Sequence, residues 1–113
     1  VLVDVPHDAR TATEEVFGPA ASVFRVRDER AGIALANAGE LGLGAAVFTA
    51  DLARGERIAR EELEAGSCFV NTFVKSDPRL PFGGIADSGY GRELGPEGMR
   101  QFTNVKTVWV QGA

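Results

Sequence analysis

The chain has 113 residues, of which 44% are hydrophobic and 25% charged, with a formal net charge of −4. This composition is typical of a globular domain, and the length suffices for one domain but not for two. The acidic balance argues against binding to nucleic acid or to a membrane surface, and no apolar run approaches the ~20 residues of a membrane helix. One cysteine excludes an internal disulfide, so a cytoplasmic location is expected.

Strands and helices are predicted to alternate over the first seventy residues. Apolar clusters predict strands at residues 1–5, 20–26, 45–49 and 67–71. One helix is predicted to begin after Asp28 and run to about Ala38, and another to begin after Thr49 or Asp51 and run to about Glu64. This order predicts an α/β fold, a mostly parallel open sheet with helices on both faces.

The glycine-rich stretch 80–95, LPFGGIADSGYGRELG, follows the last of these strands. Large apolar residues lie between its glycines, so we expect the loop to pack into one ordered shape and to contribute to a site. Arg92 and Glu93 are expected to form an ion pair that fixes it. The glycines from Gly89 onward do not follow a strand directly and lack the last glycine of the dinucleotide-binding pattern, so no phosphate site is predicted there.

The remaining C-terminal part is predicted to contain a helix and a strand. Pro96 is expected to be the first residue of a short helix, with Met99 and Phe102 packing inward. Residues 105–110, VKTVWV, are predicted to form a strand. A terminal strand exposes apolar side chains and unpaired backbone groups, so we expect it to pair with a second subunit of a homo-oligomer. The alternative is an edge strand that other parts of the same polypeptide cover.

Two segments could carry chemistry. Residues 14–19, EEVFGP, place two carboxylates beside an aromatic ring. A carboxylate can accept two hydrogen bonds from a ribose diol, and the ring could pack against a nicotinamide. The alternative is a pair of acids at a helix start, followed by a core phenylalanine.

The second segment, residues 71–82, follows the carboxyl end of a strand, where open α/β sheets bind ligands. It supplies three donors for an anionic group and two aromatic walls: Lys75, Ser76, Arg79, Phe73 and Phe82. The alternative is a solvated surface loop. Cys68 lies in an apolar strand, where desolvation favours the unreactive thiol, so we expect it to be structural. His7 has no second ligand at metal spacing, so no metal site is predicted.

The motifs of the glycine-rich stretch carry a family resemblance. PFGG followed by SGYGRELG resembles the C-terminal signature of the aldehyde dehydrogenase superfamily, and SDPRLPFGG is most similar to bacterial NAD(P)-dependent succinate-semialdehyde dehydrogenases. Ala86 stands where many members carry lysine. The resemblance covers nearly all of this chain but only about the last quarter of a typical member. The first residue is also not methionine, so we expect a segment of a longer polypeptide. Residues 1–104 would belong to the catalytic domain and 105–113 would form an oligomerisation strand and tail.

The resemblance implies oxidation of a small aldehyde, succinate semialdehyde, to the carboxylic acid with NAD or NADP. In the family a cysteine thiolate attacks the carbonyl, hydride passes to the nicotinamide, and a general base activates water. This chain contains neither the nucleophile nor the base, so no catalytic residue is assigned and the chain alone is expected to be inactive. The alternative is a free-standing, non-catalytic binding or assembly module with the same fold.

The resemblance also implies roles for four residues. Glu15 matches the position that contacts the nicotinamide ribose, and Phe17 matches the position that contacts the ring. Phe82 matches a residue that lines the aldehyde pocket. Ser76 matches a serine that helps to hold the substrate carboxylate in succinate-semialdehyde dehydrogenases.

Overall fold

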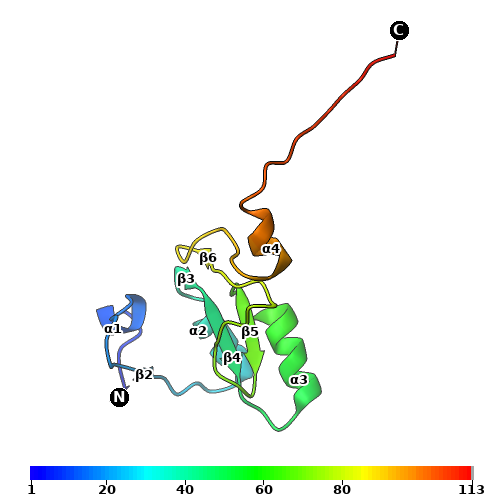
Figure 1. The fold of residues 1–113 in the computed structure, drawn as a ribbon. Coiled ribbons are helices and arrows are strands. Elements are labelled where there is room, and N and C mark those ends of the chain that lie inside the picture. The colour runs from blue at the N-terminus through cyan, green and yellow to red at the C-terminus, as the bar shows by residue number, and fades with distance from the viewer. Residues whose placement is uncertain (113) are drawn as a thin grey trace. The chain divides into compact units, whose positions relative to one another are not determined.

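The computed structural model describes residues 1–112 and divides into two compact units, Val1–Gly39 and the part that begins at Glu40. The first unit contains, in order, β1 (Leu2–Val3), α1 (Arg10–Thr13), β2 (Ser22–Val23) and α2 (Glu29–Ala36). The second contains β3 (Leu41–Gly42), β4 (Gly44–Val47), α3 (Leu52–Arg57), the π-helical turn η1 (Ile58–Glu62), β5 (Ser67–Val70), β6 (Ile85–Ala86) and α4 (Gly95–Arg100), as Figure 1 shows. Among residues 1–112, no helix is both long and apolar enough to cross a membrane.

The first unit is built on a parallel pair of strands. β1 and β2 are aligned with Leu2 opposite Ser22. The predicted strand over residues 1–5 is shorter in the structure because Asp4 takes a φ of 54°, which ends the extended conformation. The predicted helix cap is confirmed, since the Asp28 carboxylate accepts a 2.8 Å hydrogen bond from the backbone N–H of Ala31 at the start of α2.

The centre of the second unit is a βαβ arrangement. β4 and β5 pair in parallel from Gly44 opposite Ser67 to Val47 opposite Val70. The segment that connects the two strands forms α3 and η1, which pack along the strand pair (Figure 1). Of the two predicted caps, Thr49 and Asp51, it is Asp51 that caps α3, by accepting a 3.0 Å hydrogen bond from the N–H of Arg54.

Strand pairing differs from the predicted single open sheet with helices on both faces. The described strands form three two-stranded sheets, β1–β2, β3–β6 and β4–β5. The β3–β6 pair is antiparallel and places Gly42 opposite Ile85 of the glycine-rich stretch. Among residues 1–112, Ile58 is the apolar side chain that is buried, at 3% exposure. The α/β alternation is therefore confirmed, but this chain forms little core of its own.

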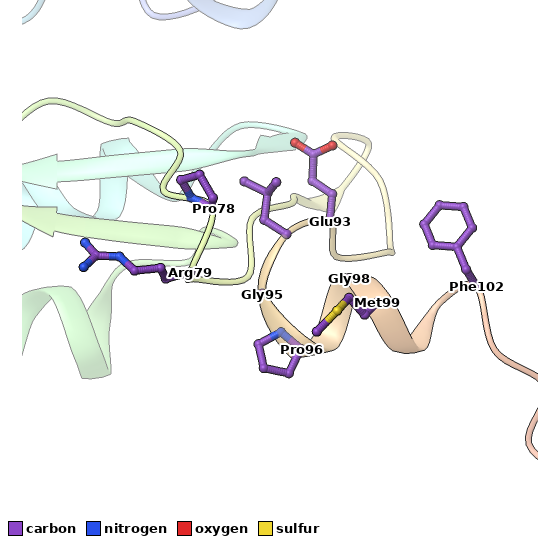
Figure 2. Close-up of a pocket in the computed structure, with 9 residues that line it drawn as sticks. Pro78, Arg79, Glu93, Gly95, Pro96, Gly98, Met99 and Phe102 are labelled. Carbon is purple, nitrogen blue, oxygen red and sulfur yellow. The ribbon is translucent and has the colours of Figure 1, made fainter.

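The C-terminal part also differs from the prediction. Pro96 lies in the first turn of α4, as expected, but Met99 and Phe102 are 68% and 94% exposed, so their predicted inward packing is wrong. They line an open groove of about 520 Å³ between α4 and the loop that carries Pro78 and Arg79 (Figure 2).

Residues 104–112 form neither helix nor strand and extend from α4 as an irregular segment (Figure 1). The predicted strand 105–110 is not formed here because a strand needs a backbone partner, and none lies among the described residues. Val105 and Trp109 are 92% and 85% exposed. Ala113, at the end of the predicted tail 105–113, lies outside the described residues, and the division at residue 104 stays a prediction.

A close backbone contact fixes the glycine-rich stretch to the start of β5. A Cβ on Gly66 would overlap the carbonyl group of Gly83, so only glycine fits there. Beyond this contact, the N–H groups of Phe82 and Glu93 each donate a 2.8 Å hydrogen bond to the other residue's carbonyl oxygen. The chain therefore closes on itself around residues 83–92.

Arg92 holds this closed loop through backbone carbonyls. Its Nη1 donates 2.8 Å hydrogen bonds to the carbonyl oxygens of Gly84 and Gly91. The predicted ion pair between Arg92 and Glu93 is not among the ion pairs of the described residues. Arg92 does fix the loop, but Glu93 contributes to it through its backbone.

We expect Gly66→Ala to lower the stability of the protein by about 1–3 kcal/mol, because the methyl group forces two backbone segments apart. Gly91→Ala is the matched control, since a Cβ there meets nothing within 4 Å. Calorimetric melting temperatures of the two variants test this. Equal melting temperatures would show that the contact at Gly66 can relax at no cost.

Candidate functional site

The first candidate site lies in the first unit, in a pocket of about 370 Å³. Its lining includes both adjacent carboxylates and the aromatic ring of the EEVFGP segment: Glu14, Glu15 and Phe17, with Thr11, Ala12, Val16, Gly18, Ala20, Ser22 and Phe24. The structure therefore brings together the two residues that were predicted to contact a nicotinamide riboside.

The two carboxylates differ in their partners. The Arg10 guanidinium donates to both carboxylate oxygens of Glu14, from Nε at 2.9 Å and from Nη2 at 2.8 Å. This hydrogen bonding lowers the pKa of Glu14 and raises the pKa of Arg10. The Glu15 side chain has no hydrogen bond or ion pair to any residue between 1 and 112. Glu15 is thus the carboxylate that can accept hydrogen bonds from a ligand.

The Phe17 side chain is exposed and does not pack into a core. Its side chain is 91% exposed and its φ is 51°, a conformation that bulky residues rarely adopt. Glu14 is the C-cap of α1, so the two acids follow a helix end. The alternative of a helix-start pair with a core phenylalanine is therefore wrong. Backbone strain of this kind is enriched at functional sites.

These residue types fit a nicotinamide riboside. A carboxylate with free lone pairs can accept both hydroxyl hydrogens of a ribose diol, and an exposed ring offers a flat apolar face to a planar heterocycle. Glu15 and Phe17 supply these two groups within one pocket. Their assignment to the cofactor stays a prediction.

The second candidate site is a cavity of about 230 Å³ in the second unit. It lies between β5 and the loop that follows: its lining is Gly66, Ser67, Cys68, Phe69, Lys75, Asp77, Leu80, Pro81 and Phe82. The structure thus brings Phe82 and Lys75 together. Ser76 is exposed and is not among these lining residues, so its role in binding substrate stays a prediction.

Of the three donors predicted for an anionic group, Arg79 is already engaged. Its Nε and Nη2 donate to the two carboxylate oxygens of Asp77 at 2.9 and 2.7 Å, and its backbone N–H donates at 3.0 Å. The guanidinium and this backbone bond lower the pKa of Asp77 to about 2. The pair is self-neutralised, which leaves Lys75 and Ser76 as donors for an anionic ligand.

Ser67 is a polar group that the sequence did not single out. Its Oγ is buried and has no hydrogen-bond partner among the described residues, and Ser67 lines the same cavity as Lys75. A buried hydroxyl without a partner is costly, so Ser67 offers a hydrogen bond to whatever fills this space. The sequence feature that could have identified Ser67 is its position as the polar residue in an otherwise apolar strand, SCFV.

Cys68 and His7 have structural surroundings. Burial raises the pKa of the Cys68 thiol, and its Sγ lies 3.9 Å from the carbonyl oxygen of Leu63. His7 packs against the ring of Phe24, with ring centroids 5.4 Å apart. Within the described residues, no group of three histidine, cysteine or acidic residues could hold a metal ion.

Comparison with known proteins identifies the family. Residues 1–108 match the sequence model of the aldehyde dehydrogenase family. The chain belongs to the aldehyde dehydrogenase family. It is 50% identical to succinate-semialdehyde dehydrogenase [NADP(+)] 1 of Mycobacterium ulcerans over 97% of its length, and 53% identical to succinate-semialdehyde dehydrogenase [NADP(+)] of Deinococcus radiodurans over 96%. It spans 24% and 22% of those proteins, or about a quarter.

Solved structures agree with this family membership. The fold matches a Mycobacterium tuberculosis aldehyde dehydrogenase complexed with NAD+ at a TM-score of 0.85 and 38% identity, over 90% of this chain and 21% of that one. It matches Staphylococcus aureus betaine aldehyde dehydrogenase in complex with NAD+ at a TM-score of 0.84 and 37% identity, over 88% and 20%.

The raised pKa of Cys68 predicts a slow thiol. We expect iodoacetamide at pH 7.5 to label Cys68 in the folded protein about tenfold more slowly than the free peptide GSCFVN, because burial leaves less thiolate. Mass spectrometry of the peptide that contains Cys68 measures the rate. Faster labelling in the folded protein than in the peptide would contradict a structural role.

Proposed function

We propose that this chain is the C-terminal quarter of an NAD(P)-dependent aldehyde dehydrogenase that oxidises succinate semialdehyde to succinate. The names of the two relatives at 50% and 53% identity support the substrate and favour NADP. NAD+ complexes among the solved structures support a nicotinamide cofactor, which accepts the hydride in this reaction.

The observation that carries the proposal is that the two adjacent acids of the EEVFGP segment differ in their partners. Arg10 neutralises Glu14, while Glu15 keeps a free carboxylate in the same pocket as the exposed Phe17 ring. Glu15 would hold the ribose hydroxyls and Phe17 would support the nicotinamide ring. A scaffold without cofactor has no need for an unpaired carboxylate beside a strained, exposed phenylalanine.

The loop after β5 would contribute to the aldehyde pocket. Phe82 would form an apolar wall for the methylene groups of the substrate, and Ser76 would donate a hydrogen bond to its distal carboxylate. The Asp77–Arg79 pair is closed on itself, so it would shape the loop and leave the substrate carboxylate to other donors.

The catalytic nucleophile and general base would lie elsewhere in the polypeptide, so this chain alone would be inactive. The exposed apolar side chains of residues 105–110 support their pairing with another subunit of a homo-oligomer: Val105, Val108, Trp109 and Val110 are between 73% and 92% exposed. A cytoplasmic location rests on the single cysteine.

Glu15→Gln in the dehydrogenase that carries this chain should lower the rate of hydride transfer about tenfold or more and change the aldehyde KM less than about twofold. The neutral amide presents one acceptor oxygen, whereas the charged carboxylate presents two, one for each ribose hydroxyl. Single-turnover formation of reduced cofactor measures the step. Glu14→Gln is the matched control and should have a smaller effect, because Arg10 already occupies Glu14. If Glu15→Gln changed only the aldehyde KM, the ribose assignment would be lost.

Ser76→Ala should raise the KM for succinate semialdehyde about tenfold, because one hydrogen bond to a charged carboxylate is removed. Butanal has the same chain length and no carboxylate, so its KM should change less than about twofold. Steady-state kinetics with both aldehydes separate the two effects. A parallel rise in both KM values would assign Ser76 to the shape of the pocket instead.

A further inference from the structure

Asn71 occupies an unusual position at the point where the chain leaves the sheet. It directly follows β5 and has a φ of 55°. Its backbone N–H still donates to the carbonyl oxygen of Val47 at 2.8 Å, which extends the β4–β5 pairing by one bond. Asparagine is one of the few residues with a side chain that adopts this left-handed conformation readily. The chain therefore turns sharply at Asn71.

The Asn71 amide clamps the end of β4. Oδ1 accepts a 2.7 Å hydrogen bond from the N–H of Thr49, and Nδ2 donates a 2.8 Å hydrogen bond to the carbonyl oxygen of the same residue. One side chain thus satisfies both backbone groups of Thr49. An amide suits this pair of hydrogen bonds because it carries an acceptor and a donor on two separate atoms, whereas a hydroxyl has both on one oxygen and a carboxylate only accepts.

The residues after Asn71 run back along β4. The Phe73 ring packs on Phe48, with centroids 5.8 Å apart, and the side chain of Val74 lies over Gly44, where a Cβ would come within 2.5 Å of it. Three successive contacts, at Thr49, Phe48 and Gly44, therefore guide the chain from Asn71 to Val74. Lys75 and Ser76 come next.

The far end of the same loop is fixed independently. Phe82 is paired with Glu93 through two backbone hydrogen bonds. Between the two ends lie the Asp77–Arg79 turn and one further contact, a 3.1 Å hydrogen bond from the N–H of Gly95 to the carbonyl oxygen of Pro78. Ser76 thus lies between the contacts of Asn71, Phe73 and Val74 on one side and the Pro78 hydrogen bond on the other, so its place depends on how the chain leaves β5. We infer that Asn71 is a positioning residue for aldehyde specificity, whose amide clamp on Thr49 places Ser76 for the substrate carboxylate. This inference rests on the proposed function.

Two variants of the dehydrogenase that carries this chain separate the clamp from the backbone conformation. Asn71→Gly keeps access to the left-handed conformation and removes the amide, whereas Asn71→Ala removes both. We expect both to raise the KM for succinate semialdehyde about tenfold, with less than about a twofold change for butanal and for NADP+. A KM for succinate semialdehyde near wild type in Asn71→Gly overturns the inference.

A control separates positioning from general loss of stability. Asp28→Ala removes a helix cap in the first unit and costs about 1 kcal/mol without touching the loop. It should lower the melting temperature and leave the ratio of the two aldehyde KM values unchanged. If Asp28→Ala shifted that ratio as Asn71→Gly does, Asn71 would be a stabilising residue only. If Asn71→Ala does not fold, the KM values of Asn71→Gly and Asn71→Ser for succinate semialdehyde are compared with that of the wild type instead.

The double variant Asn71→Gly, Ser76→Ala tests whether the two residues act together. If Asn71 works through Ser76, the double variant should have nearly the same KM for succinate semialdehyde as Ser76→Ala alone. Additive effects would overturn the inference. An unchanged KM in Ser76→Ala would instead remove the proposed carboxylate role, and with it this inference. An effect of Ser76→Ala without any effect of Asn71→Gly would overturn the inference alone.

Discussion

The backbone of Gly66 lies against the carbonyl group of Gly83, and there is no room for a side chain between them. This contact brings the glycine-rich stretch onto the start of β5. From that point Phe82 pairs with Glu93, and Arg92 binds the carbonyl oxygens that face it. The place of Phe82 beside the cavity therefore depends on the backbone contact between Gly66 and Gly83 and on its own backbone pairing with Glu93.

Local ion pairs determine which polar groups stay available at both candidate sites. Arg10 binds Glu14 and leaves the neighbouring Glu15 free, and Asp77 binds Arg79 and leaves Lys75 at the cavity. In each case the pair is formed by residues two or four positions apart, so it forms within a single turn of chain. Short-range pairing thus decides which polar side chains at the two pockets remain unpaired.

Signals that act within a few residues were predicted well from the sequence. The caps Asp28 and Asp51 and the early position of Pro96 in α4 follow from local hydrogen bonding and backbone preference. The positive φ at Phe17 was not predicted, because the sequence does not reveal which residue of a turn takes the left-handed conformation and exposes its side chain.

Strand pairing was predicted only in part. The β4–β5 pair follows from the βαβ order, but the antiparallel β3–β6 pair joins segments more than forty residues apart with no apolar pattern to mark them. The hydrogen bonds from Arg92 to carbonyl oxygens also escaped prediction, since a neighbouring acid is the obvious partner in a sequence. The terminal segment 105–110 carried a clear strand pattern, but its pairing depends on backbone groups that the described chain does not provide.

Trp109 is the only tryptophan of this chain, and it sits within that exposed terminal segment. An indole in water emits at longer wavelength than one enclosed by protein, so its fluorescence responds directly to whether the segment is covered. The residue that contributes most apolar surface to the tail is thus also a built-in optical reporter of its burial. The fluorescence of Trp109 would report, without any added label, how dilution, salt or cofactor changes the burial of this segment.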